Sequence, residues 1–348
     1  MKIFKLFPSE LTKFHLGDSN RKLKDYFSSD QLFSALYNCG MLLFNKDDSF
    51  FKELKETTFT SLFPGISIKF NEEVKDIIFL PKPLCAMEIG DKNVSRLVNH
   101  KKFKKIKFIS FDLYKEMQKM WDDKEKEIKL DLSKVVIVGG TYACTLEELQ
   151  HLQEKIDFNN VKLFKTRVVP KVVISRLNDT SDNFYFQDEL EVNYYKARDV
   201  IIRPFFYFLC KEEVSSKFKG VVRLLADEGI GGKRSLSNGI FEEVLEGDFE
   251  EEIFNHSSGY YMNLSSIYPK KEEVVNLDCY ELEERNGYIY SGRTTGIRKK
   301  TVRLIKEGSI FKDVISGRLM EMKEDVFKEH CIYLYGKGFL IPFGEVVK

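Results

Sequence analysis

The chain of 348 residues is long enough for two domains, and its 43% hydrophobic content supports a full core. It has no apolar run of membrane-spanning length and no secretory signal at its N-terminus, so we expect a cytoplasmic protein without membrane contact. The 55 basic and 54 acidic residues leave a net charge of +1, which excludes a uniformly basic protein. Any contact with nucleic acid must therefore come from local patches.

The first part of the chain predicts a strand followed by a basic loop. Residues 1–7 mix apolar side chains with lysines in a strand-like pattern. The loop at 8–27 carries His15, Arg21 and Lys22.

A helix is predicted to begin sharply after this loop. Ser28 and Gln31 have the spacing of a capping box. Asp30 lies in the first turn, where a negative charge interacts favourably with the helix dipole. We therefore expect Asp30 to cap the helix rather than to take part in catalysis.

The densest basic run is KKFKKIK, at residues 101–107. Phe103 and Ile106 interleave the lysines, which also fits a surface element anchored by two apolar side chains. We favour such a solvated element over direct contact with RNA.

Residues 165–195 predict a hairpin-like excursion, with a long strand, a polar turn and a second strand. Arg167 lies on the first strand, and Phe184 and Tyr185 lie on the second. Aromatic rings next to cations are typical of surfaces that stack unpaired bases. The same rings are equally compatible with a hairpin that packs on the core.

A strand, a helix, a glycine-rich loop and another strand follow between residues 205 and 245. This order fits a ferredoxin-like β-α-β-β-α-β domain with insertions, and the acidic run 246–252 is the best domain boundary. We therefore predict an α+β protein with two ferredoxin-like (RRM-like) domains. The first covers 1–246, and the second, smaller one covers 253–348.

The glycine-rich loop lies in DEGIGGKRSLSNGIFE, residues 227–242. Glycine lets backbone amides approach an anion, and two adjacent cations can neutralise it, so the loop is a candidate phosphate clamp. The alternative is a flexible turn with solvated charges. The clamp would comprise Gly229, Gly231, Gly232, Lys233, Arg234 and Ser235.

The loop does not match the known nucleotide-binding templates. A Walker loop needs Ser or Thr after its Lys, but Arg234 follows Lys233. Arg234 also occupies the place of the last glycine in the dinucleotide pattern, and the loop follows a helix rather than a strand. A nucleic-acid backbone is therefore the favoured source of the phosphate.

A second basic loop lies at residues 292–300 and carries Arg293 and Arg298. These arginines could clamp phosphate as well. A flexible, solvated loop is the reading that we favour for this segment.

Several motifs together resemble the RAMP superfamily of CRISPR proteins. The glycine-rich loop GIGGKRSLSNGIFE resembles the loop of that superfamily, and the closer match is the Cas-five-like fourth subunit of the type III-A Csm effector complex. The equivalent subunit of type III-B complexes is the relative most easily confused with it. The other motifs, in shared order, are FHLG, SSDQLFSAL, FLPKPL, YYMNLSSIYPKKEEV, RNGYIYSG and KEGSIFKD.

The resemblance implies a non-catalytic subunit that binds CRISPR RNA by its repeat-derived 5′ tag in antiviral defence. Such a subunit links the large polymerase-like subunit to the filament of backbone RAMP subunits. The predicted RNA-binding residues are His15, Arg21, Lys22, Arg167, Gly229, Gly231, Gly232, Lys233, Arg234, Ser235, Arg293 and Arg298.

Catalytic and metal-binding patterns are absent from the sequence. The six cysteines are far apart, and no histidine has metal-ligand spacing to another, so we expect no metal and no other cofactor. His15 is the one candidate general base, since some RAMP relatives cut precursor RNA with a loop histidine. A metal-independent endoribonuclease is therefore the alternative function, and a purely protein-bridging subunit is a third.

Overall fold

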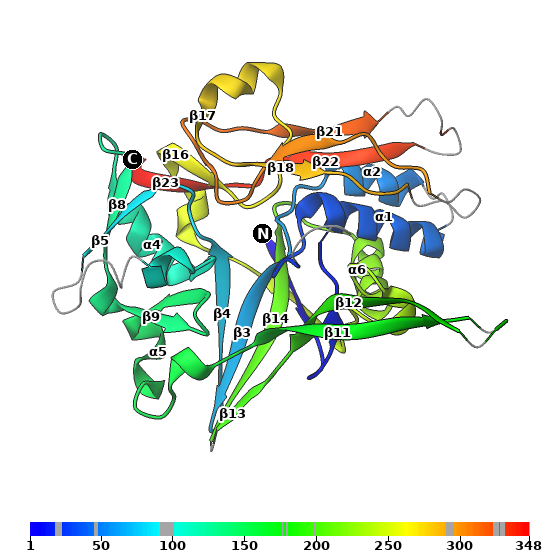
Figure 1. Cartoon of the computed structure of the whole chain (residues 1–348). Helices are drawn as coiled ribbons and strands as arrows, with labels where there is room; N and C mark the ends of the chain where they lie inside the picture. Colours follow the sequence, from blue (N-terminus) through cyan, green and yellow to red (C-terminus); the bar gives the residue numbers. More distant parts are fainter. Residues whose placement is uncertain are drawn as a thin grey trace.

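The computed structural model describes residues 1–17, 23–44, 48–90, 101–175, 177–178, 180–197, 199–289, 296–322, 327 and 331–347. The fold is a mixture of many strands and few helices (Figure 1). No helix in this part of the chain is long and apolar enough to cross a membrane.

A nine-stranded sheet forms the centre of the molecule, in the order β15-β1-β14-β3-β4-β6-β10-β9, with β13 added beside β14. Neighbouring strands are antiparallel, except that β10 runs parallel to β6. The strands are β1 (Lys2–Phe7), β3 (Phe63–Phe70), β4 (Glu73–Pro81), β6 (Phe108–Ser110), β9 (Val135–Val138), β10 (Tyr142–Thr145), β13 (Tyr195–Ala197), β14 (Val200–Cys210) and β15 (Glu243–Asp248).

Strand β14 shows why this sheet is covered on both faces. Its run PFFYFLC is apolar without interruption, as expected for a strand that is buried on both sides. Phe205 and Tyr207 pack into one hydrophobic cluster, whereas Phe206 and Phe208 pack into another. Because successive side chains of a strand point to opposite faces, these two clusters lie on opposite sides of the sheet.

The cluster that contains Phe206 is covered by three helices: α1 (Ser29–Phe44), α2 (Asp48–Glu56) and α6 (Ser216–Glu228). Ser215 caps the start of helix α6, and its side chain accepts a hydrogen bond from the amide of Phe218. Helix α1 buries Leu32, Phe33 and Leu36, which share one helical face. The amphipathic patterns of these segments therefore place α1 and α6 on the same side of the sheet.

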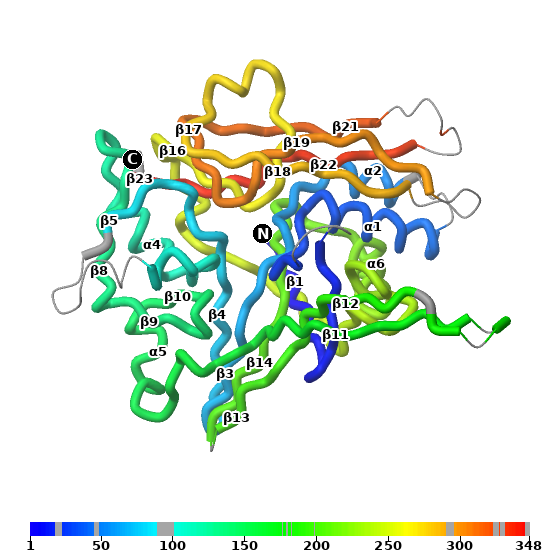
Figure 2. Tube along the Cα trace, viewed as in Figure 1, coloured from blue at the N-terminus to red at the C-terminus, as the bar shows by residue number. Residues whose placement is uncertain are grey.

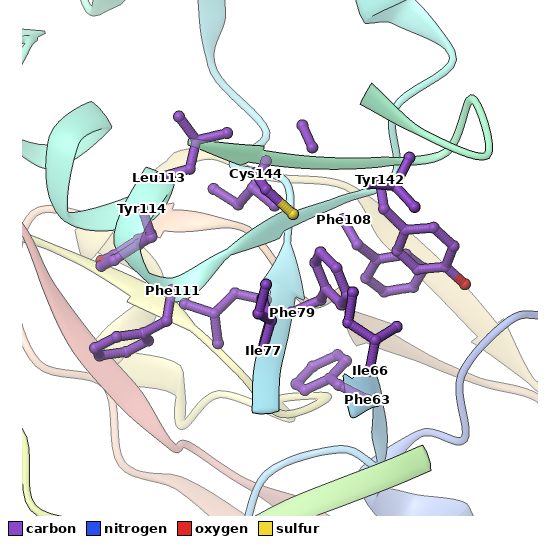
Figure 3. Close-up of a cluster of buried hydrophobic side chains, with 14 of the residues drawn as sticks. Phe63, Ile66, Ile77, Phe79, Phe108, Phe111, Leu113, Tyr114, Tyr142 and Cys144 are labelled. Atoms are coloured by element: carbon purple, nitrogen blue, oxygen red, sulfur yellow. The ribbon is translucent and has the colours of Figure 1, made fainter. Parts of the chain in front are cut away.

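The other cluster includes α4 (Phe111–Lys119) and the strands next to it. Figure 3 shows its core, in which Phe79 from β4 and Phe108 from β6 lie close to Tyr142 from β10. The same cluster also includes residues of α5 (Leu146–Leu149), β5 (Ala86–Gly90), β7 (Trp121–Asp122) and β8 (Glu127–Asp131).

The predicted hairpin consists of β11 (Phe164–Ile174) and β12 (Ser181–Val192), which pair antiparallel. Strand β2 (Lys13–Phe14) joins β12 at the base of the hairpin. The hairpin extends away from the body of the molecule as a long arm (Figure 1). The prediction of a hairpin in this region is confirmed.

The C-terminal half consists of strands in small sheets. A four-stranded sheet has the order β17-β20-β16-β23, and β18-β19 and β21-β22 form two further pairs. Strands β21 and β22 lie beside α1 and α2 in Figure 2, and β22 contacts α1. Their bounds are β16 (Ser257–Asn263), β17 (Leu277–Cys279), β18 (Leu282–Arg285), β19 (Val302–Ile305), β20 (Ile310–Phe311), β21 (Gly317–Met322), β22 (Ile332–Lys337) and β23 (Leu340–Val347).

The expected ferredoxin-like arrangement of this second half is not confirmed. A ferredoxin-like domain needs two helices, but the described residues after 250 contain only the 3₁₀ turns Glu252–Asn255 and Lys271–Asn276. Met262, Leu264 and Ile341 of this half pack into the same cluster as β3 and β4. The two halves therefore share one core, and the predicted boundary between them stays a prediction.

Candidate nucleic-acid interface

The glycine-rich loop runs from Gly229, where α6 ends, to Gly239. It lies against the segment that contains β2. The Gly232 amide donates a hydrogen bond to the His15 carbonyl at 2.9 Å, and the Gly239 amide donates one to the Lys13 carbonyl at 2.7 Å. The loop is therefore attached to the N-terminal segment by its own backbone.

Close approach of two backbone segments explains two of the glycines. Gly231 has φ +80°, and a Cβ there would lie 2.6 Å from the His15 carbonyl oxygen. Gly239 has φ +82°, and a Cβ there would lie 2.1 Å from the Ile230 carbonyl oxygen. The Gly232 amide, which the sequence assigns to a phosphate, is already bonded to His15. A phosphate role for the glycines stays a prediction.

The cationic part of the loop is a tight turn. Lys233 adopts the left-handed conformation, with φ 64°, and a 3₁₀ turn, Arg234–Leu236, follows it. Lys233 and Ser235 are exposed and Arg234 is half-buried. Within the described residues, the amides of Arg234 and Ser235 have no backbone acceptor, as expected at the start of a helical turn. The loop thus offers an anion two amides and two cations.

A cleft of about 290 Å³ opens beside this loop. Its walls come from the loop, from α1 and from the C-terminal segment that includes residues 286–288, 299 and 300. The glycine-rich loop, predicted as a phosphate clamp, and the second basic loop, for which a solvated loop is favoured, therefore meet at one cleft. Its polar lining includes Gln31, Ser34, Asn38, Arg234, Lys299 and Lys300.

The C-terminal loop presents its lysines rather than its arginine to the cleft. The Arg298 guanidinium lies 5.3 Å from the centre of the Tyr288 ring and donates a hydrogen bond to its hydroxyl at 3.2 Å. Tyr288 lines the cleft, as do Lys299 and Lys300, so Arg298 supports the wall from its side. Three predicted residues lie outside the described part of the chain: Arg21, Lys22 and Arg293.

His15 connects the loop with the hairpin. Its Nδ1 atom lies 3.1 Å from the Asp188 carbonyl oxygen on β12. A Cβ at Gly232 would lie 3.0 Å from the His15 ring, so the imidazole packs directly under the loop. These contacts favour a positioning role for His15.

The hairpin has a charged face and an apolar face. Arg167 lies on the charged face and pairs with Glu191 at 2.7 Å. The side chains of Phe184 and Phe186 lie on the other face, each 64% exposed, with their ring centres 5.1 Å apart. Exposed aromatic rings of this kind can stack unpaired bases, but Arg167 does not lie beside them.

A buried ionic cluster forms one wall of the cleft. Asp30 pairs with Arg285, whose Nε lies 3.0 Å from both carboxylate oxygens, and both side chains are largely buried. Arg285 also pairs with Glu283 at 2.9 Å. Asp30 does lie in the first turn of α1, as predicted, but its carboxylate binds a cation from the C-terminal half instead of acting only as a cap.

Burial alone would lower the pKa of Arg285, but the carboxylates of Asp30, Glu283 and Glu307 outweigh it and hold this pKa above its ordinary value. No group of three potential metal ligands occurs among the described residues.

Comparisons with known proteins identify relatives over the whole chain. Residues 256–343 match the family described as CRISPR Csm4 C-terminal domain. The chain is 28% identical over 382 residues to the CRISPR system Cms protein Csm4 of Methanocaldococcus jannaschii, with 99% of this chain and 98% of the relative covered. The protein of the same name from Thermococcus onnurineus (strain NA1) is 31% identical over 176 residues, which cover 51% of this chain and 53% of the relative.

Solved structures share the fold of this chain. One chain in the crystal structure of the Csm3-Csm4 subcomplex of the type III-A CRISPR-Cas interference complex matches with a TM-score of 0.65 and 24% identity, covering 99% of this chain and 100% of that chain. A chain of the Csm1-Csm4 cassette in complex with cA4 matches with a TM-score of 0.51 and 19% identity, covering 100% and 98%. The resemblance that the sequence motifs indicate is confirmed.

Proposed function

We propose, from its kinship with the Csm4 proteins, that this chain is the CRISPR RNA-binding subunit of a type III-A effector complex. It holds the repeat-derived 5′ tag of the RNA and links the large polymerase-like subunit to the backbone RAMP subunits. It acts in the cytoplasm, in antiviral defence, without catalysing a reaction itself. The relatives' own assemblies, with Csm3 in one structure and with Csm1 in another, support these partners.

The cleft between the glycine-rich loop and the C-terminal loop is the structural observation that supports RNA binding most directly. Arg234, Lys299 and Lys300 line it from both sides, and Lys233 is exposed beside it. Cations and free amides position a nucleic-acid backbone without reading its sequence. Polar side chains of α1, such as Asn38, face the same space and offer hydrogen bonds to base edges.

The N-terminal segment fixes the distance between this cleft and the hairpin arm. Lys13 and Phe14 pair with β12, while the carbonyls of Lys13 and His15 accept hydrogen bonds from the glycine-rich loop. One short segment, residues 13–15, therefore contacts both the glycine-rich loop and the hairpin. An RNA strand that crosses the cleft and reaches Phe184 and Phe186 would therefore contact both elements at a fixed separation along its length.

No observation favours the endoribonuclease alternative. His15 is engaged with a backbone carbonyl of the hairpin and packs under the glycine-rich loop. Within the described residues, no carboxylate forms a hydrogen bond that would orient its imidazole. A non-catalytic scaffold fits this geometry better than a general base does.

The N-terminal half supports a ferredoxin-like core for this subunit. In chain order, β1, α1, β3, β14, α6 and β15 follow the β-α-β-β-α-β pattern, and the four strands are neighbours in the order β15-β1-β14-β3. We propose that β4, β6, β10 and β9, which follow β3 in the sheet, extend this core. The glycine-rich loop then lies between the second helix and the last strand.

Replacing Lys233 and Arg234 with alanine should weaken binding of tagged guide RNA by about tenfold or more, because two charge-assisted contacts to phosphate are lost. The slope of log K against log salt concentration should fall by about 0.7 for each phosphate contact removed. Fluorescence anisotropy across a salt series measures both quantities. The matched control is Lys101→Ala with Lys102→Ala, which removes the same charge from an exposed site elsewhere. Unchanged affinity in the loop variant would remove the clamp from this account.

A further inference from the structure

A second cavity, of about 480 Å³, lies away from the glycine-rich loop. It is formed by the connector at 81–84, by the basic run at 104–108, by residues 23–26 and by strands β18 and β19 with residues that flank them. Its volume lies in the range of small-molecule sites in proteins. None of its lining residues belongs to the cleft described above.

The connector is held in place from both sides by its backbone. The Lys82 amide donates a hydrogen bond to the Lys107 carbonyl at 2.9 Å, and the Leu84 amide donates one to the Gly308 carbonyl at 2.8 Å. Gly308 has φ +86°, and a Cβ there would lie 2.7 Å from the Lys82 carbonyl oxygen. Three segments that are distant in the sequence therefore form a preformed wall.

Five lysines line this cavity, and three of them are neutralised. Lys107 pairs with Asp25 at 2.5 Å, and Lys306 pairs with Glu281 at 2.6 Å. Lys24 pairs with Glu283. The other acidic group in the lining, Glu307, accepts hydrogen bonds from the hydroxyl groups of Tyr26, Ser61 and Ser266.

Lys82 and Lys104 are not neutralised in this way. Among the described residues, neither has a carboxylate within ion-pair distance. Within the described part of the chain, the Lys82 ammonium donates one hydrogen bond, to the Phe103 carbonyl at 3.4 Å, and lies 5.3 Å from the centre of the Phe103 ring. Burial lowers the pKa of Lys82, as expected for a cation that has lost water without gaining an anion.

We propose that this cavity binds a phosphate group, carried either by a free mononucleotide or by an RNA strand. Lys82 and Lys104 supply the two unneutralised cations that such a group requires. Tyr26, Phe63 and Phe108 provide apolar walls, which suit the nucleoside next to the phosphate. The site is independent of the proposed tag-binding cleft.

The test uses the full-length chain and three probes: inorganic phosphate, adenosine monophosphate and a single-stranded RNA without the tag. Isothermal titration should show binding of at least one probe by the wild type. Lys104→Glu should reduce that affinity by at least about tenfold, since a cation is replaced by an anion. Lys104 is exposed, so this variant should fold normally.

Matched variants separate this site from others. Lys101→Glu changes the same charge in the same basic run but does not line the cavity, so it should leave the affinity unchanged. Lys82→Gln should weaken binding as Lys104→Glu does, and Lys233→Ala with Arg234→Ala should have no effect on phosphate or adenosine monophosphate.

Binding of the mononucleotide identifies a small-molecule site, whereas binding of RNA alone identifies a second contact with a strand. No binding of any probe by the wild type would overturn the proposal, as would equal losses in Lys101→Glu and Lys104→Glu. Either result leaves the proposed tag binding unaffected.

Discussion

Replacing Arg285 with methionine is expected to lower the free energy of unfolding by about 3–5 kcal/mol, because Asp30 would be left as a buried, unpaired charge. The Asp30 side chain is 8% exposed and that of Arg285 is 12% exposed, so water cannot replace the lost partner effectively. Urea unfolding followed by circular dichroism at neutral pH measures the change.

The effect should be large because the cluster joins the two halves of the chain. Glu307 accepts a hydrogen bond from Ser61 at 2.5 Å and another from Ser266 at 2.8 Å. The Ser266 hydroxyl in turn accepts one from Arg285 at 3.2 Å. Motifs that are far apart in sequence, namely SSDQ, SSIY, RNGY and KEGS, thus converge on one polar network.

Arg303→Ala is the matched control for this prediction. Arg303 pairs with Glu284 at 3.3 Å, but its side chain is 68% exposed. An exposed pair of this kind contributes about 0–1 kcal/mol. If Arg285→Met and Arg303→Ala destabilise the protein equally, the buried cluster does not hold the two halves together.

The second large effect is expected for Gly239→Ala, which should lower the free energy of unfolding by about 2–5 kcal/mol. Gly239 has φ +82°, and the new methyl group would lie 2.1 Å from the Ile230 carbonyl oxygen, so the backbone of the glycine-rich loop must move. Its hydrogen bond to Lys13 would be disturbed at the same time. Chemical denaturation measures the loss of stability.

Gly220→Ala in helix α6 provides the opposite case. Gly220 has an ordinary helical conformation, and no atom lies within 4 Å of the position that a Cβ would take. Alanine there should raise the free energy of unfolding by about 0.5–1 kcal/mol, since it restricts the unfolded chain. Similar effects of the two substitutions would show that the loop backbone tolerates displacement.

Local patterns in the sequence predicted much of this fold. The strand predicted from residue 205 is part of β14, and the capping spacing at Ser28 and Gln31 places the start of α1 correctly. The hairpin follows from two β-rich runs around a polar turn. Each of these signals depends on neighbours within a few residues.

Contacts between distant residues were not predictable in the same way. The partner of Asp30 lies 255 residues along the chain, so the sequence suggested only a helix cap. The glycines of the loop suggested room for a ligand, but Gly231 and Gly239 are needed because the loop packs against backbone carbonyls. Strand β15 begins after this loop, at Glu243.

Local sequence patterns also could not predict how the strands of the C-terminal half are arranged. Its strands are short and belong to three small sheets. The β-propensity of a segment indicates that it forms a strand but does not indicate which other strand it pairs with. The meeting of the two basic loops at one cleft follows from this pairing, since β18 and β19 carry the segment with Lys299 and Lys300 next to α1.

The most direct test of the central proposal follows binding and cleavage together on the wild-type chain. The probes are a labelled guide RNA with the repeat-derived 5′ tag and the same RNA without it, across a salt series. We expect tighter binding of the tagged RNA and no cleavage of either one. Equal binding of both RNAs would contradict recognition of the tag, and cleavage that is lost in His15→Ala would replace the scaffold with a nuclease.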